Sequence, residues 1–140
     1  MFEVDKIKTL GDSYMAVAGL IESTPDHAEH AVRMALGTIE EIGHSNAENK
    51  CDFSARIGIN SGAVIGGVIG ESRFMYDMWG VTVNVASRME SEGINGKVQV
   101  SEASYDLVKL IANLKCTSRG EVEIKGKGTM NTWLVENASA

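Results

Sequence analysis

The segment YDMWGVTVNVASRME, residues 76–90, carries the strongest structural signal in this chain because three patterns follow one another within it. A short strand is expected first, Gly80 then permits a tight turn, and a helix is expected over about residues 81–92. On that helix Asn84 and Arg88 are four positions apart, so an amide and a guanidinium lie on one face. Most pairs of this kind belong to a solvated polar face, and the segment alone does not distinguish such a face from a binding site.

Upstream of this segment the sequence predicts a strand hairpin followed by a long amphipathic helix. The hairpin strands are expected at residues 3–9 and 13–19, and a Gly-Asp turn joins them. The helix is expected to begin at Thr24-Pro25-Asp26, where a hydroxyl cap precedes a proline and an acid, and to end at Gly43. Between these signals, apolar residues recur with helical spacing at Ala28, Ala31, Val32, Ala35, Leu36, Ile39 and Ile42.

The rest of the chain completes one predicted domain over residues 1–140. Residues 56–60 alternate like a half-buried strand, and residues 63–69 are interpreted as its hairpin partner. Ser101 is expected to cap a third helix that reaches about residue 112. Further short strands are expected around residues 98–100, 122–124 and 133–135. This pattern favours an α+β or α/β fold in which helices cover a largely antiparallel sheet, and no repeat or linker indicates a second domain.

The composition narrows the classes of function. The chain has 44% hydrophobic residues, a net charge of −6 and a pI near 5.0, which disfavour a general nucleic-acid or anionic-membrane surface. Cys51 and Cys116 are 65 positions apart and form no CxxC motif, so two reduced thiols in the cytoplasm are expected. No apolar run reaches the length of a membrane span, so no membrane contact is expected within this segment.

Two predicted turns place charged side chains beside glycines. In VDKIKTLGDSYM, residues 4–15, Asp12 lies at the tip of the hairpin, where an aspartate is most often only a turn residue. In IKGKG, residues 124–128, Lys125 and Lys127 alternate with glycines, which suits phosphate oxygens but is also common in plain surface turns. Neither a GxxxxGK[ST] P-loop nor a GxGxxG fingerprint is present, so these two classes of nucleotide site are not predicted.

Taken together, four strings resemble the catalytic domain of the class III adenylate and guanylate cyclases. They occur in the family's order over nearly the whole chain, at residues 4–15, 56–62 (RIGINSG), 76–90 and 124–128. The resemblance implies an α+β fold with a ferredoxin-like antiparallel sheet and helices on one face. It also implies a head-to-tail homodimer that binds ATP or GTP at its interface, with two Mg²⁺ (or Mn²⁺) ions in each complete site.

The resemblance assigns the residues that would bind the nucleotide. Lys8 and Asp77 match the pair that reads the base, and Lys125 matches the lysine on the terminal phosphates. A donor and an acceptor in these places complement the N1 acceptor and the N6 donor of adenine. ATP is therefore the expected substrate and cyclic AMP the expected product.

The resemblance also assigns the residues of the chemical step. Asp12 matches one of the family's two metal-binding aspartates, which gives the hairpin-tip aspartate a function beyond the turn. Asn84 and Arg88 match the residues that orient the ribose and stabilise the transition state. The reaction would be a metal-assisted attack of the ribose 3′-oxygen on the α-phosphorus, with pyrophosphate leaving.

One part of the family pattern is missing. The other metal-binding aspartate lies on an opening strand, in the context Phe-x-Asp-hydrophobic-x-x-Phe, whereas FEVD at residues 2–5 begins the following hairpin. The sequence therefore predicts that residues 1–140 are the later part of the domain, with the first strand and first helices absent. The alternative to an adenylate cyclase is a catalytically silent module that dimerises or binds nucleotide. The expected location is the cytoplasm, and the chain could be the cytoplasmic part of a larger membrane or multidomain protein.

Overall fold

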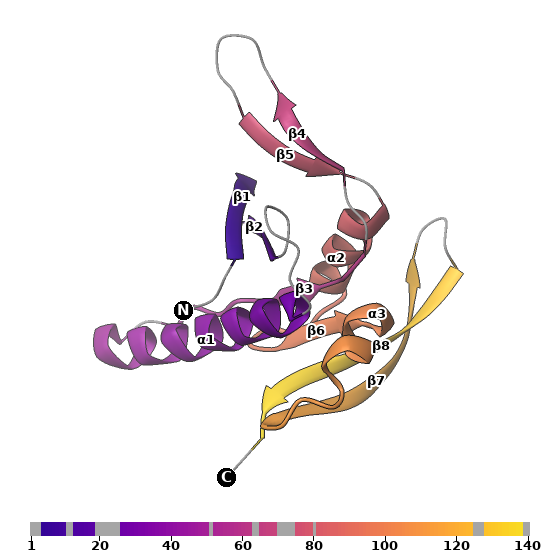
Figure 1. The fold of residues 1–140 in the computed structure, drawn as a ribbon. Helices are drawn as coiled ribbons and strands as arrows, with labels where there is room; N and C mark the ends of the chain where they lie inside the picture. The colour runs from indigo at the N-terminus through magenta and orange to yellow at the C-terminus, as the bar shows by residue number, and fades with distance from the viewer. Residues whose placement is uncertain are drawn as a thin grey trace.

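The computed structural model describes residues 4–10, 13–18, 26–50, 52–62, 65–69, 75–79, 81–124 and 128–138. Three helices and eight strands are found in these residues (Figure 1). In chain order they are β1 (Val4–Leu10), β2 (Ser13–Ala18), α1 (His27–Asn49), β3 (Ile57–Ile59), β4 (Ile65–Ile69), β5 (Met75–Trp79), α2 (Val81–Ser91), β6 (Val98–Ser101), α3 (Glu102–Val108), β7 (Leu114–Ile124) and β8 (Gly128–Asn137). The predicted α+β fold is confirmed.

The strands form one four-stranded sheet and two hairpins. The larger sheet has the order β3-β6-β8-β7; β3 and β6 are parallel, and the other two pairs are antiparallel. The β1–β2 and β4–β5 pairs form separate antiparallel two-stranded sheets. Because β3 and β6 are parallel, the chain must cross over between them, and α2 makes this crossover while packing against both strands.

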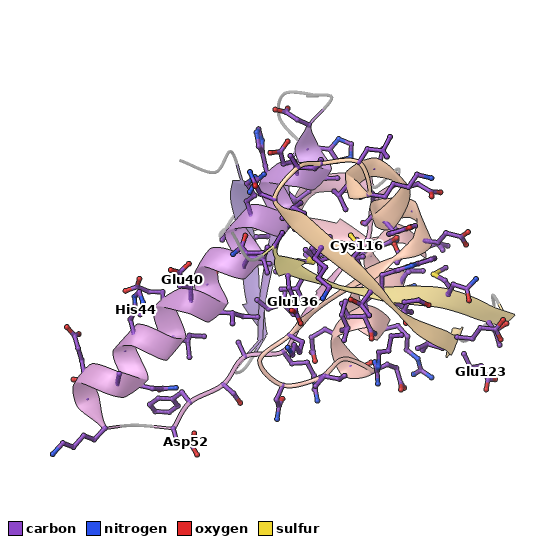
Figure 2. The ribbon with its side chains drawn as sticks, turned by 90° about the horizontal axis from the view of Figure 1, so that it is seen from below. Glu40, His44, Asp52, Cys116, Glu123 and Glu136 are labelled. Carbon is purple, nitrogen blue, oxygen red and sulfur yellow. The ribbon has the colours of Figure 1, made fainter. Side chains whose placement is uncertain are left out.

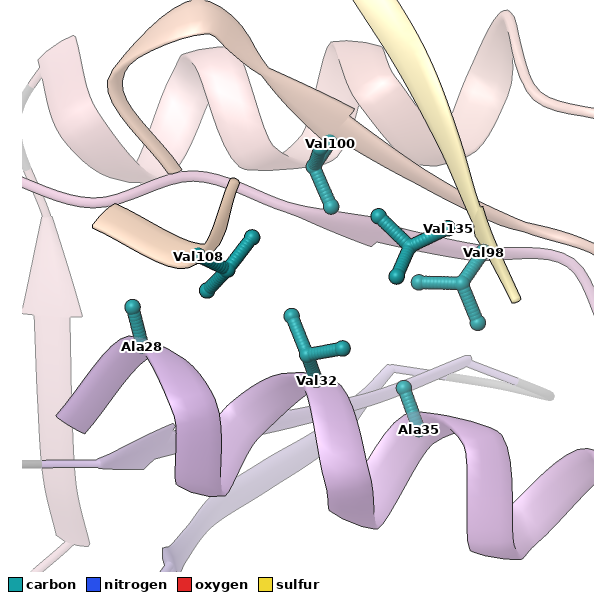
Figure 3. Packing of buried hydrophobic residues seen from close by; sticks show 7 residues of the cluster. All are labelled: Ala28, Val32, Ala35, Val98, Val100, Val108 and Val135. Atoms are coloured by element: carbon teal, nitrogen blue, oxygen red, sulfur yellow. The ribbon is translucent and has the colours of Figure 1, made fainter. Parts of the chain in front are cut away.

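The main core lies between α1 and one face of the four-stranded sheet. Alternate residues of β6 point to opposite faces, and Val98 and Val100 point toward α1. Figure 3 shows how the small side chains of α1 approach those of the sheet and of α3. The fully or nearly fully buried members of this cluster are Ala28, Val32, Ala35, Val98, Val100, Val108 and Val135. Valine and alanine dominate this core, and they let α1 pack closely over the sheet.

The three helices are divided between the two faces of the sheet. α1 and α3 share the core just described, so the expected arrangement of helices on one face applies to them. Gln99, which lies between Val98 and Val100 on β6, instead contacts Met89 of α2. α2 therefore packs on the opposite face, where Val85 and Met89 form a second cluster with Val122 and Met130 of β7 and β8.

The helix α1 is longer than the sequence predicts. Gly43 does not end it; the helix continues to Asn49, and Lys50 then adopts a left-handed conformation with φ 53°. A glycine inside a helix costs up to about 1 kcal/mol, which stabilising contacts elsewhere can offset. Asn46 provides such contacts, because its side chain accepts from the Phe53 backbone N–H at 3.0 Å and donates to the Phe53 carbonyl at 2.6 Å.

Two further sequence predictions are wrong in detail. Residues 65–69 do not pair with β3; β4 pairs antiparallel with β5, with Gly67 opposite Asp77, while β3 pairs with β6. Pairing between sequence neighbours was the simplest expectation, but the α2 crossover gives β3 a buried parallel partner instead. Ser101 does cap α3, accepting from the Ser104 N–H at 3.4 Å, yet that helix ends at Val108. Within the described residues, no helix has both the length and the apolar character that a membrane span requires.

Candidate functional site

The helix α2 holds Asn84 and Arg88 on its outward side. Val85 and Met89, which are 1% and 0% exposed, anchor the inward side against β7 and β8. Because residues four apart lie on one face, the burial of this pair leaves Asn84 exposed and Arg88 partly exposed one turn further along. The amide and the guanidinium are thus brought to a common side of α2, as the sequence predicts.

Arg88 lies where α2 meets the end of β7. Its Nε donates to the carbonyl oxygen of Glu123 at 3.1 Å, and its Nη2 is 3.6 Å from Oε1 of Glu92. The side chain is 41% exposed, so its charge remains available to an anion from solution. Figure 2 shows Glu123 at the end of the molecule opposite His44 and Asp52. The contact brings Arg88 next to the carboxyl-terminal end of β7.

The amino-terminal end of α2 is fixed by a hydrogen-bonded group of small polar side chains. Asn60, which follows β3, donates its Nδ2 to the Thr82 carbonyl at 3.0 Å. The Oδ1 of Asn60 accepts from the hydroxyl of Ser101, and the hydroxyls of Ser61 and Ser104 are 2.8 Å apart. Ser101 and Thr82 therefore act through Asn60 to join the starts of α3 and α2, which sets where Asn84 lies.

A close approach of α2 to β3 depends on Gly58. A Cβ at this position would lie 2.0 Å from the Glu90 nitrogen, 2.5 Å from the Met89 carbonyl carbon and 2.7 Å from the Ala86 oxygen. These are backbone atoms of the helix, so only a residue without a side chain allows the observed packing. Gly58 and Asn60 were not among the predicted site residues. The signal for Gly58 was present, because a glycine inside a strand often marks a close backbone approach.

The structure also brings together the strands that carry the two predicted base-reading residues. Lys8 belongs to β1 and Asp77 to β5, and these two strands contact each other although they belong to different sheets. The backbone of both strands is described, whereas the side chains of Lys8 and Asp77 lie outside the description. Asp12, between β1 and β2, and Lys125, between β7 and β8, lie outside the described residues altogether.

Glu136 and Cys116, which lie apart from Arg88, have shifted pKa values. The pKa of Glu136 is lowered, first because its carboxylate accepts a hydrogen bond from Lys97 at 2.8 Å and second because of the Lys97 charge. Partial burial raises the pKa of the Cys116 thiol. In the part of the chain that the structure describes, no group of three or more His, Cys, Asp or Glu side chains is placed to hold a metal ion.

Comparison with known proteins gives the family. The model of the adenylate and guanylate cyclase catalytic domain family matches residues 1–137. The chain is 40% identical over 136 residues to the receptor-type guanylate cyclase gcy-28 of Caenorhabditis elegans, covering 95% of this chain and 11% of that protein. It is 39% identical over 130 residues to an adenylate cyclase of Mycobacterium tuberculosis (strain ATCC 25618 / H37Rv), covering 93% of this chain and 29% of that protein.

A solved structure agrees with the described fold. The guanylate cyclase domain of RhGC from Catenaria anguillulae, crystallised with GTP, superimposes with a TM-score of 0.89 at 38% identity. The match covers 99% of this chain and 75% of that chain. The curated relatives are much longer, and this chain spans only 11% and 29% of the two described above. The sequence match and the fold agree, and the chain belongs to the adenylate and guanylate cyclase catalytic domain family.

Proposed function

We propose that this domain is an adenylate cyclase that converts ATP to 3′,5′-cyclic AMP and pyrophosphate in signal transduction. One observation carries the choice of adenine: β1, which carries Lys8, contacts β5, which carries Asp77. A lysine donates to the N1 acceptor of adenine, and an aspartate accepts from its N6 amino group. Guanine presents the opposite donor and acceptor at these two positions, so the same pair would leave both contacts unfavourable.

The relatives include both guanylate and adenylate cyclases, so overall similarity does not choose between the bases. The choice depends on the few side chains that meet the base edge. Lys8 supplies a donor and Asp77 an acceptor, which suits the acceptor and donor edge of adenine. In a guanylate cyclase of this family, a glutamate would be expected at position 8.

The chemical step would use the side chains at α2 and at the end of β7. The ribose 3′-oxygen attacks the α-phosphorus and loses its proton, while the bond from that phosphorus to the bridging oxygen breaks and pyrophosphate leaves. Asn84 would orient the ribose, and Arg88 would meet the negative charge that grows on the phosphorus oxygens in the transition state. Lys125 would hold the terminal phosphates. The partial exposure of the Arg88 side chain supports this role, because an anion from solution can reach its charge.

Asp12 would be the protein ligand for Mg²⁺ or Mn²⁺. The donor set fits this ion, since Mg²⁺ in nucleotide sites is commonly held by one or two carboxylates together with substrate phosphates. When bound, the metal would lower the pKa of the attacking hydroxyl and neutralise charge on the leaving group. Residues 1–140 contain a match to only one of the family's two metal-binding aspartates. We therefore expect the 140-residue chain on its own to have little cyclase activity, and to regain it when a second carboxylate is supplied upstream.

The working unit would be a cytoplasmic homodimer, since the cytoplasm supplies ATP. In the family, one subunit provides the metal-binding aspartates and the other provides the remaining groups. This chain carries Asp12 from the first set and Arg88 from the second, so two copies could form equivalent shared sites. Asp12→Ala and Arg88→Ala variants should each be inactive alone and regain part of the activity when mixed. Absence of recovery in demonstrated mixed dimers would contradict shared sites.

The choice of base is tested by Lys8→Glu, measured in a form of the protein that makes cyclic nucleotide. We expect kcat/KM for ATP to fall roughly fivefold to 150-fold, which is equivalent to about 1–3 kcal/mol. The ratio of kcat/KM for GTP to kcat/KM for ATP should rise. Lys115→Glu, which makes the same charge change at an exposed position of β7, is the control and should leave that ratio unchanged. Equal use of ATP and GTP by the unsubstituted protein would refute the proposal.

A further inference from the structure

The carboxyl-terminal turn of α2 receives side-chain donors from two strands of the sheet. Gln99 of β6 is fully buried and donates its Nε2 to the Met89 carbonyl at 3.0 Å. Arg119 of β7 donates from Nη1 to the Glu92 carbonyl and also to Oε1 of Gln99. The last carbonyls of a helix have no partner within the helix, so these contacts satisfy groups that would otherwise need water.

A break in the regular pairing of β7 allows Arg119 to reach α2. The register between β7 and β8 shifts between Ser118 and Gly120, which leaves Arg119 as the extra residue of a bulge. Gly120 has φ +109°, a conformation that a residue with a side chain rarely adopts. Bulges of this kind redirect a side chain from its regular position on the strand. Here the redirected side chain is the cation that reaches the end of α2.

The position of this contact relative to Arg88 gives it a consequence for catalysis. Arg88 and Arg119 line the same surface depression, together with Glu92, Glu121, Val122 and Glu123. The carbonyl that Arg119 bonds belongs to Glu92, the residue directly after α2, whose side chain is the ion-pair partner of Arg88. Arg119 also complements the negative end of the α2 dipole. It therefore fixes the turn of helix that begins at Arg88.

We propose that Arg119, acting through Gln99 and the Glu92 carbonyl, is a positioning residue that holds Arg88 in its catalytic place. The placement of Arg88 by Arg119 does not depend on which reaction the protein catalyses, whereas the effect of Arg119 on turnover rests on the proposed function. Arg56, which precedes β3, offers a contrast because it also bonds a residue of α2. Its Nε bonds the Glu90 side chain at 2.6 Å rather than a backbone carbonyl, and both partners are partly exposed. Its loss should leave the helix backbone in place.

The first measurement needs no turnover. The Nε–H resonance of Arg88, which reports its bond to the Glu123 carbonyl, is recorded by NMR in the unsubstituted protein, Arg119→Ala, Arg119→Lys and Arg56→Ala. We expect the resonance to shift in Arg119→Ala, to return part of the way in Arg119→Lys, and to remain in place in Arg56→Ala. An unchanged Arg88 resonance in folded Arg119→Ala would overturn the inference, whatever nucleotide the protein uses.

The second measurement is a double-mutant cycle on the rate of cyclic nucleotide formation. Since a misplacement of about 1 Å can cost on the order of a hundredfold in rate, we expect Arg119→Ala to lower kcat at least tenfold with KM changed less than about threefold. In an Arg88→Lys background, which keeps a cation but lacks the guanidinium that Arg119 is proposed to hold in place, the same substitution should have little further effect. Equal losses in both backgrounds would show a merely structural role and overturn the inference. If the unsubstituted protein forms no cyclic nucleotide, the proposed function fails and the NMR result alone decides.

Discussion

Replacing Gly58 by alanine should displace α2 and thereby impair both stability and catalysis. The added methyl carbon would lie 2.0 Å from the Glu90 nitrogen, whereas ordinary van der Waals contact begins at 3.4 Å. One of the two elements must therefore move by about 1.4 Å. The atoms in the way are helix backbone, which cannot turn aside as the end of a flexible side chain could, so α2 must shift as a unit.

The expected cost follows from this displacement. Overpacking a well-filled interior typically costs about 1–3 kcal/mol, and the backbone clash at Gly58 places this substitution at the upper end or beyond. A shift of about 1 Å at a catalytic group can lower the rate on the order of a hundredfold. Because Asn84 and Arg88 move with α2, we expect kcat to fall by about that factor in an active form of the protein.

The assay compares Gly58→Ala with Gly43→Ala by urea unfolding and by cyclic nucleotide formation. Gly43 is an exposed residue inside α1, and nothing lies within 4 Å of a Cβ built there. Alanine at that position should raise the free energy of unfolding by about 0.5–1 kcal/mol, because glycine is a poor helix former. The same glycine-to-alanine change should thus lower the free energy of unfolding at position 58 and raise it at position 43. A Gly58→Ala protein as stable and as active as the unsubstituted chain would refute the argument.

Three further predictions concern the rest of the fold. In a Cys51→Ser background, Cys116 should react with iodoacetamide at pH 8 more slowly than a free thiol, since its raised pKa lowers the thiolate fraction; equal rates would contradict this. Lys97→Ala should raise the pKa of the Glu136 carboxyl toward its ordinary value in a carbon-13 NMR titration. Because the folded pKa is lowered, this pair stabilises the fold above the ordinary carboxyl pKa, and its small contribution is lost as the pH falls through the folded pKa. Val32→Ala should cost roughly 2 kcal/mol in the free energy of unfolding, because it opens a gap in the main core; a cost near zero would show that the core closes over it.

The sequence predicted those features that depend on local rules. The spacing of Asn84 and Arg88 on one face of a helix follows from 3.6 residues per turn, and the structure confirms it. The Ser101 cap follows from one side chain and the next backbone N–H groups. The predicted end of the helix at Gly43 was wrong, because Gly43 is only a local signal. The contacts of Asn46 with Phe53, both of which come later in the sequence, outweigh that signal.

Features that depend on distant partners were not predictable in the same way. The β4–β5 pairing required knowing that β3 pairs with β6, across α2. The Arg119 contact requires a bulge in β7 and a buried Gln99 on β6, and no pattern within either strand indicates the other. Lys8 and Asp77 were assigned through the family resemblance, and the contact between their strands is compatible with that assignment.

The division of the proposed site between separate sheets bears on how one family can include cyclases for two bases. On the proposed roles, the base is read from β1 and β5, which belong to the two small hairpins, whereas Arg88 is carried by α2 on the four-stranded sheet. A helix as short as α2, Val81–Ser91, is marginal by itself, so its position comes from tertiary contacts. Those contacts include the ones made by Gly58, Gln99 and Arg119, which lie on three strands of the larger sheet. A substitution of Lys8 on β1 would therefore leave these supports of α2 in place, whereas β5 itself also contacts α2. Base preference can then change while the groups of the chemical step keep their geometry.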